Sequence, residues 1–189
     1  MNTKIVVIII IAYLYGIFEY YISFRQRKKI KVVSKDDKGS LWVLSISITI
    51  GYLLSFSVAA TRIGRIYHWN LLFALGILII ILGFIIRIIS IRTLKQYFTY
   101  SVTKVENHEI IETGFYKFIR HPGYLGQILI FIGLTISLSN WIAVILMLLS
   151  ILIGYLNRIR VEENFLIEQI GVKYSDYQMR TKKLIPKIY

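Results

Sequence analysis

Two groups of ionisable residues adjoin apolar stretches of this chain, and both could do chemistry. Positions 120–126 read RHPGYLG, so that Arg120, His121 and Pro122 come directly before an apolar run. Proline suits the first turn of a helix, where a missing backbone N–H has no consequence. A helix that begins there presents free N–H groups and a positive dipole end beside Arg120 and His121. The pattern predicts an anion-binding site; the simpler interpretation is an anchor, in which Arg120 reaches the lipid headgroups.

The second group lies in NRIRVEENFL. On a continuous helix Arg158 and Glu162 are four residues apart and share a face, whereas Glu163 points about 100° away. A surface ion pair in this order would stabilise the helix by only a few tenths of a kcal/mol, so stability explains the pair poorly. Arg158 also follows 17 residues without a charge, at the edge of an apolar segment where ionisable groups are usually functional.

Several other kinds of site are excluded by the residue types. The three histidines, His68, His108 and His121, lack metal-ligand spacing, and the chain has no cysteine, so we expect no metal site. No G-x-G-x-x-G or P-loop is present, so a nucleotide-like cofactor must bind outside a Rossmann fold. Glu19, near the end of the first apolar run, is a further candidate or simply reaches the membrane interface.

The elements that must position these residues are membrane helices. Of the 189 residues, 56% are hydrophobic, and several apolar runs are long enough to cross a hydrocarbon layer of about 30 Å. The first run lacks a cleavage site and is expected to stay in the protein. We predict an all-α, polytopic membrane protein with one domain over 1–189 and five transmembrane helices, near 4–24, 41–60, 70–90, 122–138 and 141–158.

The distribution of basic residues predicts the orientation of these helices. The net charge of +13 is concentrated in the segment after the first span, in 91–120 and in the tail from Arg158. By the positive-inside rule these segments are cytoplasmic, so we expect a multi-pass cell membrane protein with its N terminus outside and its C terminus in the cytoplasm. Membrane lipids, rather than nucleic acid, are the expected partners of these charges. Trp42, Trp69 and Trp141 each begin a span, as interfacial anchors do.

The connections place the two ionisable groups together. Only SLSN separates the fourth and fifth spans, so these should form an antiparallel hairpin that brings Arg120 and His121 near Arg158. Ser and Gly residues in the second and fourth spans favour close contact with other helices. The polar stretches 95–121 and 158–189 are the expected cofactor-binding parts, and the second contains a short helix ended by Pro186.

An ordered series of motifs over about residues 98–186 resembles the isoprenylcysteine carboxyl methyltransferase family of integral-membrane enzymes. The series is HEIIETGFY, RHPGYLG, the LSN turn, RIRVEENFL, GVKYSDY and a closing IP. Upstream, DDKGS looks like the Asp-Arg-Gly-Ser of shorter, prokaryotic-type members. The chain departs from the pattern at Gly123, where serine is frequent, and at Asn157, where a charge is frequent, which leaves prenylcysteine specificity less secure than cofactor use.

The resemblance implies methyl transfer from S-adenosylmethionine to a carboxylate of a lipophilic, isoprenylcysteine-like substrate that enters from the bilayer. Arg158 matches the arginine that orients the substrate, and with Glu163 it forms the expected catalytic pair. The resemblance places the cofactor against residues of the loop and the two groups described above: His108, Ile110, Ile111, Tyr116, Arg120, His121, Pro122, Gly123, Tyr124 and Glu162. No general base is needed, because a carboxylate with a pKa of about 4 is already ionised at neutral pH.

Other functions stay open at this point. The acceptor could be an alkylated phenol, a pyrone or a phospholipid amine, although an amine has no need of an arginine. A nicotinamide-dependent membrane reductase would share a distantly similar C-terminal half. A non-enzymatic helical scaffold or transporter component predicts polar groups in the spans rather than in the cytoplasmic segments. Cytoplasmic segments 95–121 and 158–189 carry most of the polar motifs here.

Overall fold

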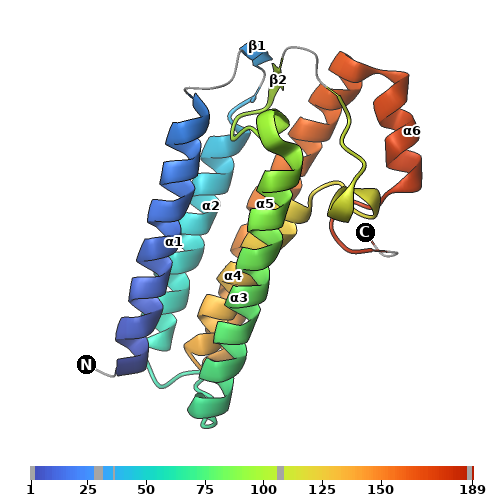
Figure 1. The fold of residues 1–189 in the computed structure, drawn as a ribbon. Coiled ribbons are helices and arrows are strands. Elements are labelled where there is room, and N and C mark those ends of the chain that lie inside the picture. Colours follow the sequence, from blue (N-terminus) through green and yellow to red (C-terminus); the bar gives the residue numbers. More distant parts are fainter. Residues whose placement is uncertain (1–2, 28–31, 36, 106–108, 187–188) are drawn as a thin grey trace.

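The computed structural model describes residues 3–27, 32–35, 37–105, 109–186 and 189 of the chain. Five long helices form an elongated bundle (Figure 1). Their bounds are Thr3–Arg27 for α1, Ser40–Ala59 for α2, Trp69–Leu94 for α3, Pro122–Ser137 for α4 and Trp141–Ile170 for α5. The predicted segments lie within these helices except for residues 60 and 138, and α5 continues well beyond residue 158, where the apolar run ends.

The helical membrane fold is confirmed. Among the residues that the structure describes, four helices, α1, α2, α3 and α5, are long and apolar enough to cross a membrane. The remaining apolar helix, α4, has 16 residues, which corresponds to about 24 Å at 1.5 Å per residue and is shorter than a typical hydrocarbon layer. Trp69 and Trp141 are the first residues of α3 and α5, in agreement with their expected place at the start of a span.

The smaller elements gather at the end of the bundle opposite the N terminus (Figure 1). They include a short antiparallel pair of strands, β1 (Val32–Lys35) and β2 (Thr103–Val105), which the sequence did not predict. Strands this short carry too few residues for an alternating pattern. The 3-10 helices η1 (Lys95–Tyr97) and η2 (Gly114–Lys117) and the helix α6 (Val172–Arg180) complete this end.

Glycines let α3 and α4 pack backbone to backbone at two levels. A Cβ at Gly76 would lie 2.5 Å from the carbonyl oxygen of Gly133, and one at Gly83 would lie 2.6 Å from that of Gly126. No larger side chain fits at such distances, which is the small-residue packing expected between membrane helices. Two turns separate the contacts on each helix, so the two axes stay close over most of α4.

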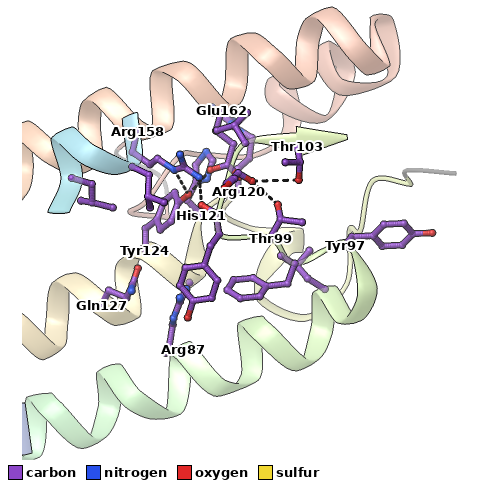
Figure 2. A pocket seen from close by; sticks show the side chains of 18 of the residues that line it. Arg87, Tyr97, Thr99, Thr103, Arg120, His121, Tyr124, Gln127, Arg158 and Glu162 are labelled. Atoms are coloured by element: carbon purple, nitrogen blue, oxygen red, sulfur yellow. Dashed lines mark hydrogen bonds between the residues drawn. The ribbon is translucent and has the colours of Figure 1, made fainter. Parts of the chain in front are cut away.

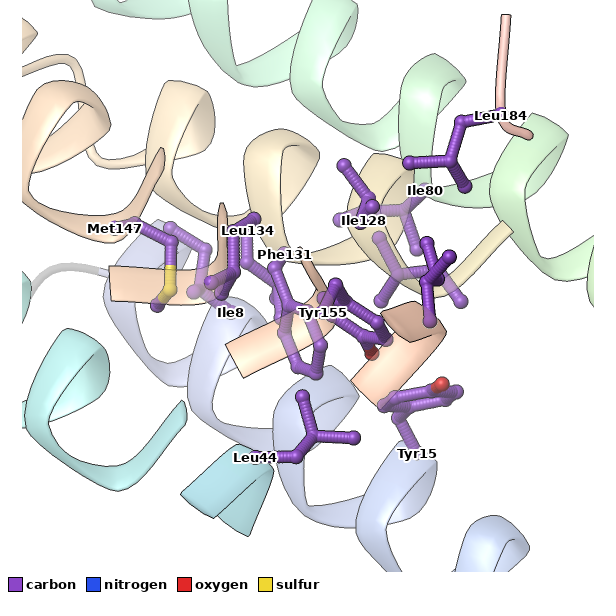
Figure 3. Packing of buried hydrophobic residues seen from close by; sticks show 13 residues of the cluster. Ile8, Tyr15, Leu44, Ile80, Ile128, Phe131, Leu134, Met147, Tyr155 and Leu184 are labelled. Atoms are coloured by element: carbon purple, nitrogen blue, oxygen red, sulfur yellow. The ribbon is translucent and has the colours of Figure 1, made fainter. Parts of the chain in front are cut away.

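The second tight pair, α2 with α5, is held by small and polar residues. Gly154 of α5 faces Leu44 and Ser47 of α2, and Ser55 donates a 2.8 Å hydrogen bond to the carbonyl of Ala143. Between the two pairs lies a buried apolar cluster, in which side chains from α1, α2, α4 and α5 meet around Phe131 and Tyr155 (Figure 3). The prediction that the second and fourth spans face other helices is therefore confirmed.

The predicted hairpin between α4 and α5 is present. Asn140 caps α5 by accepting a 3.0 Å bond from the N–H of Ala143, and its amide donates to the carbonyl of Ile63. The same residue thus ties this turn to the connection between α2 and α3. As a result, the start of α4 and the charged end of α5 lie at the same end of the bundle.

The C-terminal segment returns to the start of α4. The N–H of Arg120 donates to the carbonyl of Lys182 at 2.7 Å, and the N–H of His121 donates to that of Lys183 at 3.0 Å. The prediction that the last helix ends at Pro186 is wrong, because α6 ends at Arg180 and Thr181 is extended. Residues 181–184 are not helical and pair instead with residues 118–121. The sequence pattern does not show this pairing.

Candidate active site

Arg120 and His121 converge on one carboxylate. Nε of Arg120 donates a 2.7 Å hydrogen bond to Oε1 of Glu163, and Nε2 of His121 lies 3.1 Å from the same oxygen. Nη1 of Arg120 also donates to the carbonyl of Thr181. The anion predicted at the start of α4 is therefore, in the structure, the side chain of Glu163. Lys183, with Nζ 3.6 Å from Oε2 of Glu163, adds a second cationic side chain beside that of Arg120.

Tyr124, one turn into α4, joins the two predicted residues of α5. Its hydroxyl donates to Oε2 of Glu162 and accepts a 3.2 Å bond from Nε of Arg158. Its ring stacks on that of His121, with centroids 5.4 Å apart and an interplanar angle of 8°. Figure 2 shows Arg158, Tyr124 and Glu162 turned toward one another. The prediction that Arg158 and Glu162 share a face is confirmed, and a tyrosine bridges them.

The rest of the Arg158 guanidinium is bonded to segments distant in sequence. Nη1 donates to Oδ1 of Asp37 and, at 2.6 Å, to Oγ of Ser40, while Nη2 donates to the carbonyl of Tyr100. Arg158 is 2% exposed. Because its N–H groups donate to several protein acceptors, the Arg158 guanidinium has little rotational freedom. Its position is therefore defined before any ligand binds.

Asp37 is itself held by several donors. Its carboxylate accepts from the N–H of Leu41 at 3.0 Å and from that of Val102 at 3.1 Å, in addition to Arg158. Burial alone raises the pKa of Asp37, but the Leu41 N–H, the Arg158 guanidinium and the Val102 N–H together lower the pKa below the usual range. Asp37 therefore remains ionised beside Arg158 at neutral pH.

A cavity of about 570 Å³ adjoins these residues. Its polar part lies between the 109–116 loop, α4, α5 and α6, where Glu162 and His121 reach it. Its apolar part runs between α1, α2 and α4 and is lined by Ala12, Leu44, Ile48, Tyr52 and Phe131. Arg158 lines the cavity as well. The volume is in the range of sites for small organic ligands, which is about 300–1,000 Å³.

Most of the predicted site residues lie on this cavity. Those that line it are Ile110, Ile111, Tyr116, Arg120, His121, Gly123, Tyr124, Arg158 and Glu162. Pro122 is the first residue of α4 and is buried behind the lining, and Glu163 pairs with Arg120 and His121 from behind it. His108 falls outside the described residues.

Four polar residues that bond to Arg158 or to Glu19 were not predicted as site residues: Ser40, Asp37, Arg87 and Tyr100. Arg87 of α3 forms a bidentate ion pair with Glu19 of α1, at 2.9 and 2.8 Å. A charged residue inside an apolar span is a signal for function that could have identified Arg87. Asp37 and Ser40 belong to the DDKGS motif, whose resemblance to the family pattern indicated a role without indicating which residue carried it.

The fold and the site define the class of protein: it is a polytopic helical membrane protein with polar side chains gathered around an internal cavity at one end. The chain belongs to the isoprenylcysteine carboxyl methyltransferase (ICMT) family, whose model matches residues 74–168, about half of its length. The family resemblance drawn from the motifs is thereby confirmed. Glu19, Asp37 and Ser40, which reach the site from α1 and from the start of α2, precede the matched region.

Curated relatives agree with this assignment. Protein-S-isoprenylcysteine O-methyltransferase of Saccharomyces cerevisiae is 36% identical over 116 residues, which are 60% of this chain and 48% of that protein. Protein-S-isoprenylcysteine O-methyltransferase B of Arabidopsis thaliana is 31% identical over 59% of this chain and 57% of that protein. The chain thus spans about half the length of the curated relatives it matches.

A solved structure has the same fold. It is described as the eukaryotic intramembrane Ras methyltransferase ICMT without a monobody, and it superimposes with a TM-score of 0.60 and 26% sequence identity. The superposition covers 82% of this chain and 55% of that chain. The coverage of this chain is larger than that of the family model, so the likeness of fold extends beyond residues 74–168.

Proposed function

We propose that this protein is an integral-membrane methyltransferase that moves a methyl group from S-adenosylmethionine to a carboxylate on a lipophilic, isoprenylcysteine-like acceptor. The observation that carries the proposal is the place of Arg158, a fixed cation on a cavity that is polar toward α6 and apolar between α1, α2 and α4. The names of the curated relatives and of the solved structure support the reaction class.

The apolar part of the cavity suits the lipophilic portion of the acceptor. Leu44, Ile48 and Phe131 offer it no hydrogen-bonding groups, and burial of a hydrocarbon chain against them is favourable by about 25 cal/mol per Å². An acceptor held there extends toward Arg158, whose Nη2 has a second N–H that can donate a charge-assisted hydrogen bond to a carboxylate. The acceptor thus meets apolar walls and a cation in the order that an isoprenylcysteine presents them.

The polar part suits S-adenosylmethionine. Glu162 can accept hydrogen bonds from hydroxyl or ammonium groups, and Ile110, Ile111 and Tyr116 offer apolar and aromatic surface for a base. Burial of the Tyr116 hydroxyl, followed by the charge of Glu162, raises the pKa of Tyr116, so that this residue stays neutral. When bound, the cofactor supplies an electrophilic methyl group on a sulfonium. In this proposal His121, Gly123 and Tyr124 also hold the cofactor.

The residues of the chain then act by positioning rather than by proton transfer. An acceptor carboxylate is already ionised at neutral pH and needs no base. Arg158 orients one of its oxygens, and the bonds to Asp37, Ser40 and Tyr124 keep the guanidinium from turning with the ligand. Fixed geometry of this kind lowers the barrier to an in-line displacement. Glu163 acts behind the lining, where it holds Arg120 and His121.

We further propose that α1 to α5 all cross the membrane, with the N terminus outside and the end that carries α6 in the cytoplasm. The basic segments support this orientation, because they follow α1, α3 and α5, whereas the connections at the other end carry two basic residues, Arg62 and Arg65. S-adenosylmethionine would enter from the cytoplasm, and the acceptor would enter from the bilayer along α1 and α2.

The first test is calorimetric binding of S-adenosylmethionine to the detergent-purified protein, with nicotinamide adenine dinucleotide as the competing ligand class. Glu162→Gln is compared with Glu168→Gln, a control on the same helix at an exposed position away from the cavity. We expect selective binding of S-adenosylmethionine that is weakened about ten-fold or more in Glu162→Gln, because a hydrogen bond to a charged group is lost, and unchanged in Glu168→Gln.

The second test is transfer of a labelled methyl group to N-acetyl-S-farnesylcysteine, with a phosphatidylethanolamine vesicle as the amine acceptor. Arg158→Ala should abolish transfer to the carboxylate while S-adenosylmethionine still binds. Binding of the nicotinamide dinucleotide instead would contradict the methyltransferase assignment. Methylation of the amine alone, independent of Arg158, would contradict the carboxylate acceptor.

A further inference from the structure

Glu19 and Arg87 form a buried ion pair that the proposed chemistry does not use. Nε and Nη2 of Arg87 each donate to one carboxylate oxygen of Glu19, and the side chains are 2% and 15% exposed. Both residues lie within apolar helices, α1 and α3, where isolated charges are strongly unfavourable and persist when a structural or functional constraint retains them. The pair therefore requires an explanation beyond the packing of two helices.

Tyr100 connects this pair to Arg158. Its hydroxyl donates to Oε2 of Glu19, and its own carbonyl accepts a hydrogen bond from Nη2 of Arg158. The guanidinium of Arg87 also lies 5.0 Å from the ring centroid of Phe98, within the range of a cation–π contact. The Glu19–Arg87 pair thus holds the backbone around Tyr100 on the side away from Arg158.

The same segment is fastened on its other side by the second ion pair. The N–H of Val102 donates to Oδ1 of Asp37 at 3.1 Å, and Asp37 is bonded to Arg158. We name residues 98–102 the strap, since they run between the Glu19–Arg87 pair and the Asp37–Arg158 pair. In Figure 2, Arg87 on α3 and Arg158 on α5 lie on opposite sides of the cavity.

We propose that Glu19 and Arg87 are positioning residues for Arg158, acting through the Tyr100 hydroxyl and the strap. The inference rests on the proposed function, in which Arg158 orients the acceptor carboxylate. If the strap shifts, the Tyr100 carbonyl and the Val102 N–H shift with it, and the guanidinium loses one fixed acceptor directly and the support of Asp37 indirectly. Methyl transfer then slows because the acceptor is misaligned, whereas the cofactor end of the cavity is untouched.

A purely structural role is the competing explanation, because the pair also anchors α1. Apart from Glu19, α1 meets the bundle mainly through apolar contacts, such as Phe18 against Phe84 with ring centroids 4.9 Å apart. An anchor depends on the Glu19–Arg87 bonds and not on the Tyr100 hydroxyl. Tyr100→Phe therefore separates the two roles: it removes one hydroxyl and leaves the ion pair, the ring and the Tyr100 carbonyl in place.

The experiment compares Tyr100→Phe with Tyr20→Phe, a control on α1 whose side chain is 73% exposed. Methyl transfer to N-acetyl-S-farnesylcysteine gives kcat and KM, calorimetry gives the Kd for S-adenosylmethionine, and hydrogen exchange follows the peptide that covers residues 98–103. For Tyr100→Phe we expect a fall in kcat of about five- to ten-fold, the effect of one lost hydrogen bond. The Kd for the cofactor should stay within about two-fold, exchange should quicken, and Tyr20→Phe should match the parent protein.

A second variant tests the chain of contacts. Glu19→Gln should slow turnover at least as much as Tyr100→Phe, and the double variant should be no slower than Glu19→Gln alone, because both changes break the same link. Should Glu19→Gln fail to fold with Arg87 left unpaired, Tyr100→Phe still decides. Wild-type kcat in folded Tyr100→Phe would overturn the proposal, as would a parallel loss of cofactor affinity.

The proposed function fails separately. If the parent protein binds no S-adenosylmethionine and methylates no acceptor, the reaction assignment is wrong. The exchange measurement still decides the physical link in that case: unchanged exchange of residues 98–103 in Tyr100→Phe would show that Glu19 does not hold the strap, and faster exchange would support it.

Discussion

Arg158 and Asp37 are 121 residues apart in the chain, and Nη1 of Arg158 donates directly to Oδ1 of Asp37. Asp37 stands just before α2 and Arg158 stands where the apolar part of α5 ends, so the contact joins two helices that pack along their length. It also means that the cation of the site already has an anion beside it, fixed by three donors.

Asp37→Asn is expected to slow methyl transfer while leaving the fold intact. Asparagine can still accept from the N–H of Leu41 and so retains the support of the first turn of α2, but it cannot balance the charge of Arg158. We expect kcat to fall about ten-fold or more, since a charge-assisted bond that orients Arg158 is lost. The check is a comparison of kcat with Asp37→Ala, which should lower the thermal midpoint more than Asp37→Asn does because the bond from the Leu41 N–H is lost as well. Faster turnover in Asp37→Asn would show instead that Asp37 competes with the acceptor.

The pH dependence of stability should report the same bond. The pKa of Asp37 is lower in the folded protein than in the unfolded chain, so its contribution is complete above the unfolded value of about 3.9 and is lost as the pH falls through the lower folded value. The difference in thermal midpoint between the parent and Asp37→Asn should be constant from roughly pH 5 to pH 7 and should shrink below about pH 4. A difference that grows on acidification contradicts the assignment.

Glu162 and Glu163 should respond differently to the same change. Glu163 is a shared partner of Arg120, His121 and Lys183, so Glu163→Gln leaves the buried Arg120 guanidinium without its anion and is expected to destabilise the protein by about 3–5 kcal/mol. Glu162 lines the cavity, so Glu162→Gln should weaken cofactor binding with little change in the thermal midpoint. Calorimetry and thermal unfolding of both variants check this, and a reversed pattern would exchange the two roles.

Close packing of α3 on α4 gives a prediction for stability alone. A Cβ at Gly126 would lie 2.7 Å from the carbonyl oxygen of Gly83 and 2.8 Å from the backbone nitrogen of Arg87, so Gly126→Ala must push the helices apart and is expected to lower the stability by about 1–3 kcal/mol. Gly16→Ala on α1, where nothing lies within 4 Å of the added atom, should instead raise the stability through its better helix propensity. Thermal unfolding in detergent measures both. Equal stability of the two variants would contradict the packing.

The sequence predicted the helices and the hairpin because both depend on local signals. Apolar length, Pro122 at a helix start and the SLSN turn are readable without knowledge of the fold. It also placed Arg158 beside the start of α4. The partners of Arg158 could not be predicted in the same way, because Asp37 and Ser40 come from one distant segment and Tyr100 from another, and only the bundle brings them together.

The structure differs from the sequence-based predictions mainly in which charged residues pair across segments. The sequence predicts an anion-binding site beside Arg120. In the structure the anion bonded to Arg120 is Glu163, the residue that the family resemblance pairs with Arg158 for catalysis. Glu19 was predicted to be either a further site residue or an interfacial side chain, and the structure gives it a buried partner in Arg87. A single helix shows which face a residue occupies, and which opposite charge it meets is decided by tertiary packing. The strands β1 and β2 were not predicted either, because each pairs with a strand that is distant in the sequence.

Tyr52 is the cavity-lining residue of α2 farthest from the polar end of that helix, and we expect it to set the length of the acceptor chain. Tyr52 of α2 packs edge-on against Phe131 of α4, with ring centroids 5.7 Å apart at 85°, and both line the cavity. Counting from Ser40 at the polar end of α2, Tyr52 is twelve residues, or about 18 Å, farther along the helix. A lipophilic chain that extends away from Arg158 therefore meets this pair last.

Tyr52→Ala is expected to shift the preference toward longer acceptors. Removal of the ring deepens the cavity, so kcat/KM for the geranylgeranyl analogue of N-acetyl-S-farnesylcysteine should rise relative to the farnesyl compound by about ten-fold, the effect of burying roughly two more methylene groups. Leu53→Ala, at the next position of α2 but 64% exposed, is the matched control and should keep the parent ratio. An equal loss of activity with both chain lengths would mean that Tyr52 only supports the packing of α2 on α4, and the acceptor chain would then have to leave the cavity by another path.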